Sequence, residues 1–116
     1  IFIVLGDFNV IPEDIDTYNP EEWKDDALFK METRKAYREI LSLGFIDSFR
    51  QFNQEPENYT FWDYQRGAWK RNKGIRIDHI LTSPQASDKT NNVYIDKSLR
   101  DKEKPSDHVP IIIDLS

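Results

Sequence analysis

The sequence contains no cysteine, which excludes a disulfide framework and thiolate metal sites and fits a reducing compartment, so we expect a cytoplasmic protein. It has no apolar run near the roughly 20 residues of a membrane span, and no membrane partner is expected. The chain begins at Ile1, within a strand pattern, with neither an initiator methionine nor a signal peptide. We therefore expect an upstream part of the protein to be missing, by design, proteolysis or disorder.

The composition is that of a folded chain. The 116 residues are 38% hydrophobic, 13% aromatic and 32% charged, which provides a core for one domain or part of one. The formal net charge of -5 argues weakly against a general polyanion binder, but it hides local patches, and acidic residues gathered for a metal lower the total. The distribution of charge is therefore more informative than its sum.

The first half of the chain predicts one strand and two helices. Residues 1–5 form a continuous, β-branched apolar run, which predicts a strand buried on both faces. Asn19 and Pro20 open a short helix, and apolar residues at helical spacing predict a longer one from about residue 30 to residue 43. Gly44 supplies its C-terminal stop. Residues 45–53 remain ambiguous, a short helical turn being one interpretation.

Most of the predicted strands lie in the second half. Their composition predicts strands over residues 59–64, 75–83, 92–97 and 111–115. The loop over residues 66–74 would join the first two in a hairpin-like pair, and Pro84 would start a short helix or turn. No repeat or linker divides the chain. The predicted fold class is α/β, with a mixed β-sheet flanked by helices.

Acidic residues stand beside three apolar strands, in the segments Gly6–Asn9, Arg76–His79 and Ser106–His108. If the strands are neighbours, one rim of the sheet gathers Asp7, Asn9, Asp78, Asp107 and His108. Clustered carboxylates repel one another unless a cation or protons compensate them, and oxygen ligands with few nitrogens suit Mg²⁺ or Mn²⁺. Each motif alone also fits ordinary turn chemistry. The combination is what favours a site.

Asp78 interrupts an apolar strand, so a cation, a histidine or the end of the sheet must compensate its charge if the strand is internal. We predict that it pairs with His108, because a carboxylate on one imidazole nitrogen fixes the tautomer and frees the other nitrogen for a phosphate or proton. His79 points to the opposite face of the strand, since side chains alternate, and is interpreted as structural.

A basic and aromatic stretch covers residues 66–76. It is typical of a surface that contacts a phosphate backbone, although a solvated loop is an equal alternative. It contains Arg66, Trp69, Lys70, Arg71, Lys73 and Arg76. In the preceding strand, alternation places Phe61 and Asp63 on one face and Trp62 and Tyr64 on the other, so one face belongs to the core and the other is available.

Five segments in order, "GDFN", "GFIDSFR", "YTFWDY", "GIRIDHIL" and "EKPSDHVP", resemble the C-terminal half of bacterial exonuclease III, the apurinic/apyrimidinic endonuclease. "GDFN" and "SDH" alone indicate the wider endonuclease/exonuclease/phosphatase superfamily. The resemblance covers nearly the whole chain. It implies half of a four-layered α/β sandwich, with residues 1–116 forming the C-terminal half of the domain and the N-terminal half missing.

The resemblance implies a metal-dependent DNA-repair nuclease that cleaves double-stranded DNA at abasic sites and degrades it from 3′ ends. By position, Asp7 would activate the water, Asn9 would hold the phosphate, and Asp78 would support His108, which contacts the scissile phosphate. Metal ligands would come from Asp7, Asn9, Asp107 and His108. An abasic pocket would involve Phe61, Ile75 and Ile77, and Trp62 and the basic stretch would lie near the DNA.

The resemblance also implies residues with no counterpart in this chain, namely an Asn, the principal metal-binding Glu and a Tyr of the N-terminal half. We therefore expect the chain alone to be nearly inactive, and the Mg²⁺ or Mn²⁺ need not be retained by it. Its apolar sheet face would be exposed, which predicts self-association. The alternatives are another phosphoesterase of the superfamily, acting on a phosphomonoester or phospholipid, and a non-catalytic DNA-binding module.

Overall fold

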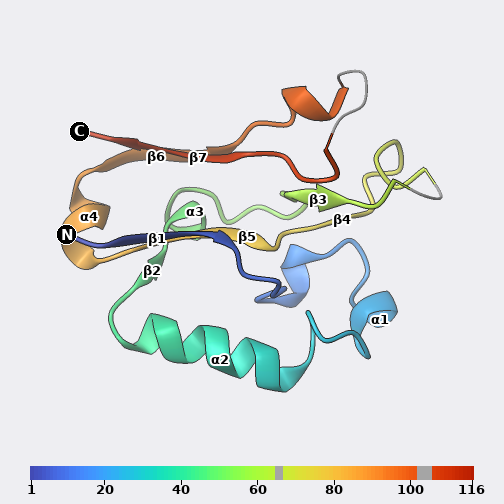
Figure 1. Cartoon of the computed structure of the whole chain (residues 1–116), viewed down its shortest axis with the longest axis horizontal. Coiled ribbons are helices and arrows are strands. Elements are labelled where there is room, and N and C mark those ends of the chain that lie inside the picture. The colour runs from blue at the N-terminus through green and yellow to red at the C-terminus, as the bar shows by residue number, and fades with distance from the viewer. Residues whose placement is uncertain (65–66, 102–105) are drawn as a thin grey trace.

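The side chains of one strand explain the layers of the molecule. In the computed structural model, which describes residues 1–64, 67–101 and 106–116, β5 (Asp78–Thr82) lies between β1 (Ile3–Asp7) and β2 (Ile46–Asp47). Both neighbours are antiparallel to it. Because side chains alternate along a strand, Ile80 and Leu81 face opposite sides of this sheet, and both are fully buried. Figure 1 shows the sheet between a helix and a hairpin.

The helix is α2 (Met31–Ser42), which agrees with the predicted helix to within a residue at each end. Its Tyr37 is buried in one core cluster with Leu81 and Val10, and Ile40 and Leu41 pack against them. Gly44 adopts φ +110°, a conformation that favours glycine, and ends the helix as predicted.

The opposite layer is a hairpin of β6 (Thr90–Ile95) and β7 (Ile111–Leu115), close to the two strands predicted there. The ambiguous residues 45–53 form β2 and then α3 (Ser48–Phe52), whose start is capped by the Asp47 carboxylate accepting from the Arg50 N–H. Phe49 of this helix is buried with Ile80 and Val93 between the sheet and the hairpin. The predicted α/β class is therefore confirmed, and the strand pairs among the described residues are antiparallel.

The predicted hairpin over residues 59–83 forms, but with shorter strands, β3 (Phe61–Trp62) and β4 (Gly74–Ile75). The second predicted strand divides because the Arg76 N–H donates to the Asp16 carbonyl and the Ile77 N–H to the Thr60 hydroxyl. Hydrogen bonds to another segment thus interrupt the ladder before β5 begins.

Short elements complete the described chain. Asn19 caps α1 (Pro20–Trp23) as predicted, by accepting from the Glu21 N–H. The others are η1 (Asp14–Asp16), α4 (Pro84–Asp88) and η2 (Ser98–Asp101). In the part of the chain that the structure describes, no helix is both long and apolar enough to cross a bilayer.

The prediction that the first strand is buried on both faces is wrong for this chain. β1 lies at the edge of its sheet, and Phe2, Val4 and Leu5 are 70%, 44% and 64% exposed. Ile3 is half-buried and packs against the cluster around Phe49. The pattern correctly identified an apolar strand, but the burial of an edge strand depends on what packs against it.

Candidate active site

The strand register brings the first two acidic residues together. Because β1 and β5 are antiparallel, the end of β1 meets the start of β5, and Asp7 lies directly opposite Asp78. Like charges at opposed positions of a sheet destabilise it unless something compensates them. The register therefore creates a local need for positive charge at this edge.

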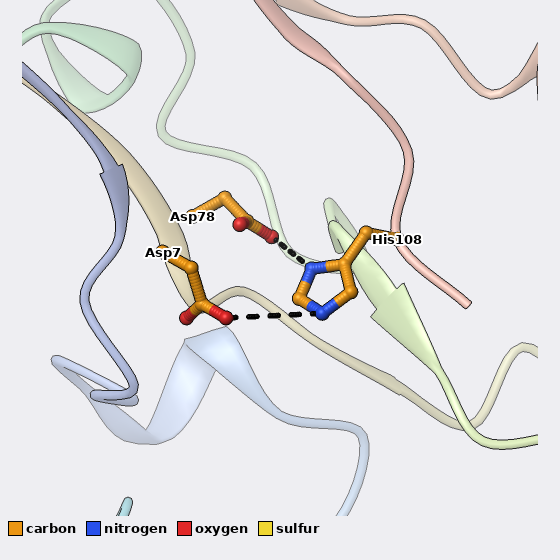
Figure 2. A group of neighbouring side chains, drawn as sticks. All are labelled: Asp7, Asp78 and His108. Atoms are coloured by element: carbon orange, nitrogen blue, oxygen red, sulfur yellow. Dashed lines mark hydrogen bonds and ion pairs between the residues drawn. The ribbon is translucent and has the colours of Figure 1, made fainter. Parts of the chain in front are cut away.

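His108 meets that need from a distant part of the sequence. It lies just before β7, and a β-bridge joins its backbone to Phe61, whose ring packs edge-on to the imidazole with centroids 5.2 Å apart. Its Nδ1 lies 2.9 Å from the Asp78 carboxylate and its Nε2 lies 3.8 Å from that of Asp7 (Figure 2). The predicted pairing of Asp78 with His108 is confirmed. Because an ionised carboxylate can only accept hydrogen bonds, Nδ1 of His108 carries a proton and donates it in a hydrogen bond to Asp78, while Nε2 faces Asp7.

The electrostatics of the pair follow from partial burial. Burial alone would lower the pKa of His108, but the hydrogen bond to Asp78 and the charges of Asp78, Asp7 and Asp107 raise it above its usual value. Burial raises the pKa of Asp78, against the hydrogen bonds from His108 and from the Thr60 hydroxyl. The imidazole is therefore inclined to carry a positive charge beside the acidic edge.

Thr60 is a site residue that the sequence did not indicate. Its side chain is fully buried, and its hydroxyl oxygen accepts the backbone N–H groups of Ile77 and Asp78, at 3.1 and 3.2 Å. The same hydroxyl lowers the pKa of the Asp78 carboxyl, against the effect of burial. Thr60 thus fixes the backbone at the start of β5, where Asp78 lies. Nothing in its sequence position distinguishes it from an ordinary strand threonine.

The residues around Asp7 fit a hard divalent cation. Asp7, Asp78 and His108 each offer a ligand atom, and these atoms lie within 4.8 Å of one another. Asn9 follows in a tight turn with φ +50°, and its N–H donates to the Asp7 carboxylate at 2.9 Å. Carboxylate and amide oxygens are the ligands that Mg²⁺ and Mn²⁺ prefer. Asp107 is not part of the described three-residue group, although its charge contributes to the raised pKa of His108.

An apolar wall adjoins the site on the side of Phe61. Phe61 and Ile75 line a cavity of about 400 Å³ together with Trp23, and charged residues, among them Asp63 and Lys73, line the rest of it. Ile77 packs in the same cluster as Phe61 and Ile75 but, unlike them, does not line the cavity. For Ile77, the prediction of a direct DNA contact is therefore corrected to a role behind the wall.

Two residues predicted to contact DNA lie in the core instead. Trp62 is 0% exposed, and its indole N–H donates to the Asn72 side chain. Arg76 is 1% exposed, and its guanidinium binds the carboxylates of Asp16 and Asp47. Neither side chain reaches the surface, so both predictions are corrected. A buried cation stabilised by two buried carboxylates cannot be distinguished from a DNA-binding cation by sequence alone.

The rest of the basic stretch is divided between surface and core. Lys70 and Arg71 are exposed, whereas Lys73 is half-buried with its ammonium 5.8 Å from the Tyr18 ring. Trp69 is half-buried and packs edge-on to Trp62, with ring centroids 4.8 Å apart. Arg66 lies outside the described residues. The exposed cations keep open the prediction of a phosphate-contacting loop.

The interpretation of His79 as structural is confirmed. The side chain is fully buried on the face opposite Asp78, where it contacts the rings of Phe8 and Tyr37. Burial, and next the charge of Arg76, lower its pKa to about 4. The ring is therefore neutral in the folded protein at neutral pH.

Residues 1–108 match the model of the endonuclease/exonuclease/phosphatase family. The chain belongs to this family. It is 34% identical to exodeoxyribonuclease III of Haemophilus influenzae over 116 residues, and 37% identical to a DNA-(apurinic or apyrimidinic site) endonuclease of Dictyostelium discoideum over 117 residues. These alignments cover 94% and 98% of the chain, but 43% and 32% of the two relatives.

Solved structures of the family have the same fold. An AP endonuclease from Archaeoglobus fulgidus matches 97% of the chain with a TM-score of 0.93 and 39% identity. A 3′ phosphatase from Neisseria, bound to a product DNA hairpin, matches 98% with a TM-score of 0.94 and 38% identity. The chain corresponds to 44% of each of these proteins, so it spans less than half of the relatives it matches.

Proposed function

We propose that this chain forms the C-terminal half of a metal-dependent DNA-repair nuclease, which hydrolyses phosphodiesters at abasic sites and removes nucleotides stepwise from 3′ ends of duplex DNA. The observation that carries the proposal is the contact of His108 with both Asp78 and Asp7, from three separate segments. The relatives named exodeoxyribonuclease III and AP endonuclease support this choice of substrate.

In the proposed mechanism, each side chain acts on a defined part of the reaction. Asp7 accepts a proton from the attacking water and orients it toward the phosphorus. His108, charged and held through Nδ1 by Asp78, presents Nε2–H to a phosphate oxygen, where it stabilises the charge that develops. Asn9 donates its amide N–H to another phosphate oxygen. The wall of Phe61 and Ile75 accepts a baseless sugar more readily than a stacked nucleotide.

Asp7, Asn9 and Asp107, with Nε2 of His108, are the residues that would hold Mg²⁺ or Mn²⁺. A bound divalent ion would neutralise phosphoryl charge and assist the leaving oxygen. Because Nδ1 of His108 is occupied by Asp78, only its Nε2 is available. Nε2 can bind the ion only without its proton, so in the charged form of the mechanism it serves the phosphate and the ion is left to Asp7, Asn9 and Asp107.

The substitution Asp7→Asn, in the protein at its full natural length, tests the proposal. An amide cannot accept the proton of the water, so cleavage of an abasic duplex should fall at least about 100-fold while DNA affinity is retained. The matched control is Asp25→Asn, at an exposed position after α1, which should leave both unchanged. Unchanged cleavage in Asp7→Asn would contradict the role of Asp7 as the base. DNA binding without cleavage by the unaltered protein would favour a non-catalytic DNA-binding module.

One observation favours a second candidate, a DNA 3′-phosphatase. The Neisseria protein whose structure matches this chain is a 3′ phosphatase bound to a product DNA hairpin. The two activities differ in the bond that is broken, so a duplex carrying either an internal abasic site or a terminal 3′-phosphate separates them. Rapid release of inorganic phosphate without strand cleavage would select the phosphatase.

We further propose that the exposed apolar residues of β1 are covered by the other half of the protein, and in its absence by a second copy of this chain. Val4 and Leu5 are exposed on this edge strand, and Phe2 is exposed just before it. Contiguous exposed apolar surface favours association in water.

A further inference from the structure

His79 connects the acidic turn to the core. It is fully buried and lies next to Asp78 in β5, but on the opposite face of the strand. Its Nε2 is 3.0 Å from the carbonyl oxygen of Val10, and its Nδ1 is 3.1 Å from the guanidinium of Arg76. Val10 follows Asn9 directly, so the ring contacts the segment that carries Asp7 and Asn9.

The partners of the ring determine its tautomer. A guanidinium can only donate hydrogen bonds, so Nδ1 of His79 must accept from Arg76 and carries no proton. A carbonyl oxygen can only accept, so Nε2 must carry the proton that it donates to Val10. The two contacts therefore select the neutral Nε2–H form, and they are satisfied by no other protonation state.

Arg76 is held in place for this role. Its Nε donates to the Asp16 carboxylate at 2.7 Å and its Nη2 donates to Asp47 at 2.8 Å. Both carboxylates are largely buried, and Arg76 keeps the pKa of each below its usual value although burial acts in the opposite direction. The guanidinium is thus fixed on two sides, and the N–H that it presents to His79 has a defined direction.

The turn itself is attached to β5 and the segment before it at two points. The Phe8 N–H donates to the Ile77 carbonyl at 3.1 Å, and His79 donates to the Val10 carbonyl two residues later. Between these points lies Asn9, in its left-handed conformation, with its N–H on the Asp7 carboxylate. Releasing the second point would let this turn move relative to Asp78 and His108.

We propose that His79 is a positioning residue for the reaction: as the Nε2–H tautomer selected by Arg76, it holds the Val10 carbonyl and thereby places Asp7 and Asn9 against Asp78 and His108. The catalytic consequence rests on the nuclease function proposed above. The tautomer and its hydrogen bond do not depend on that function.

The tautomer is tested by long-range ¹⁵N–¹H NMR of the protein at its full natural length, labelled with ¹⁵N-histidine. The expected result near neutral pH is a proton on Nε2 of His79 and none on Nδ1, with the assignment lost or altered in Arg76→Gln. A proton on Nδ1, or a doubly protonated ring, overturns the proposal without regard to enzymatic activity.

The positioning role is tested with two substitutions at one site. His79→Leu keeps a side chain of similar volume but removes both hydrogen bonds. The amide of His79→Gln carries one acceptor and one donor, so it can replace the accepting Nδ1 and the donating Nε2–H of the ring. On an abasic duplex, His79→Leu should lower kcat roughly 10- to 100-fold with KM nearly unchanged, since displaced catalytic groups slow the reaction. His79→Gln should recover most of kcat.

The matched control is Thr82→Val. Thr82 is equally buried in the same strand and shares a hydrogen bond with Ser87 at 2.7 Å, at the end of β5 away from the turn. It should lose stability but keep kcat per folded molecule.

Normal kcat in His79→Leu, or an equal loss in Thr82→Val, overturns the positioning role. If His79→Leu does not fold, a loss of kcat in folded His79→Gln as large as that in Arg76→Gln overturns it. If the unaltered protein cleaves no abasic DNA, the nuclease proposal fails, and the NMR result still decides the tautomer.

Discussion

At the scale of single residues, His108 depends on Asp78 for both its tautomer and its charge. Asp78→Asn replaces the acceptor of the Nδ1 proton with an amide that can present N–H instead. We expect kcat on abasic DNA to fall roughly 100-fold or more, as for the orienting carboxylate of other catalytic histidines. Single-turnover cleavage by the full-length protein measures this effect.

The same variant should change the titration of His108. Burial lowers the pKa of this ring, but the Asp78 hydrogen bond and the charges of Asp78, Asp7 and Asp107 together raise it, so Asp78→Asn should lower the His108 pKa, as measured by NMR titration. Asp88→Asn, at the exposed end of α4, is the control and should change neither quantity. An unchanged His108 pKa in Asp78→Asn would contradict the proposed pairing in solution.

His79 predicts a pH dependence of stability. Its folded pKa of about 4 lies below its ordinary value of 6.5, because of burial and next the charge of Arg76, while the Val10 carbonyl, Asp47 and Asp16 oppose the shift. Above pH 6.5 both states are neutral at this position. As the pH falls from 6.5 to 4, only the unfolded chain gains the proton, so the free energy of unfolding decreases, by on the order of 3 kcal/mol in total.

Urea denaturation of the unaltered protein and His79→Gln, at pH 7.5 and pH 5, measures this contribution. The decrease between the two pH values should be smaller in His79→Gln, which has no proton to gain there. The folded-state pKa values of Asp16 and Asp47 lie below their usual value of 3.8. The stability that these two carboxylates contribute to the protein is therefore lost at a lower pH than the contribution of His79. Equal decreases in both proteins would contradict a neutral, buried His79.

At the scale of elements, the β3–β4 hairpin leaves no space at Gly74. A Cβ added there would lie 2.5 and 2.6 Å from atoms of the Tyr59 side chain and 2.7 Å from the indole nitrogen of Trp62. Gly74→Ala should therefore cost about 3 kcal/mol of stability, at the upper end for overpacking, because both rings are buried and cannot move aside. Chemical denaturation measures the cost.

Gly67→Ala is the comparison for this prediction. Gly67 has φ +64° and open space, with only the end of the Arg71 side chain within 4 Å, so the cost is the backbone term of about 1 kcal/mol. Equal costs for the two alanines would show that the rings around Gly74 rearrange.

Also at the element scale, the pairing of the strands could not be predicted from the sequence. The sequence predicted where the apolar strands lie, but not which segments pair with each other. Two hydrogen bonds between remote segments show the pairing: the Trp62 N–H donates to the Asp107 carbonyl, and the Val109 N–H donates to the Thr60 carbonyl. These bonds deliver His108 to Asp78. Pairing of this kind depends on the whole fold and leaves no local pattern.

At the scale of the whole molecule, the 116-residue chain alone should self-associate through β1. Sedimentation velocity over a range of concentrations should show dimers or larger species, and Leu5→Lys should shift them toward monomer by placing a charge on the apolar strand. Met31→Lys, at the equally exposed start of α2, is the control and should have little effect. A monomer at high concentration would contradict the prediction.

The isolated chain should also show almost no cleavage of abasic DNA. The described site has one acidic edge with a histidine, whereas the family resemblance places a further metal-binding Glu, an Asn and a Tyr in the other half. The measurement is cleavage at saturating Mg²⁺ or Mn²⁺, with the full-length protein as the positive control. Robust cleavage by the isolated chain would contradict the division of the site between two halves.

The sequence by itself determined the kinds of groups present and their local structure: apolar strands, the α2 helix with its glycine stop, and the Asp and His residues beside strand ends. Periodicity and turn chemistry are local, so they can be predicted locally. Only the tertiary structure decided that Asp7 faces Asp78 in register, that Thr60 binds the Asp78 N–H and His79 the Val10 carbonyl, and that Arg76 and Trp62 are buried. Burial and pairing are set by contacts between distant segments, and a residue type such as arginine serves equally in a core ion pair and on a DNA-binding surface.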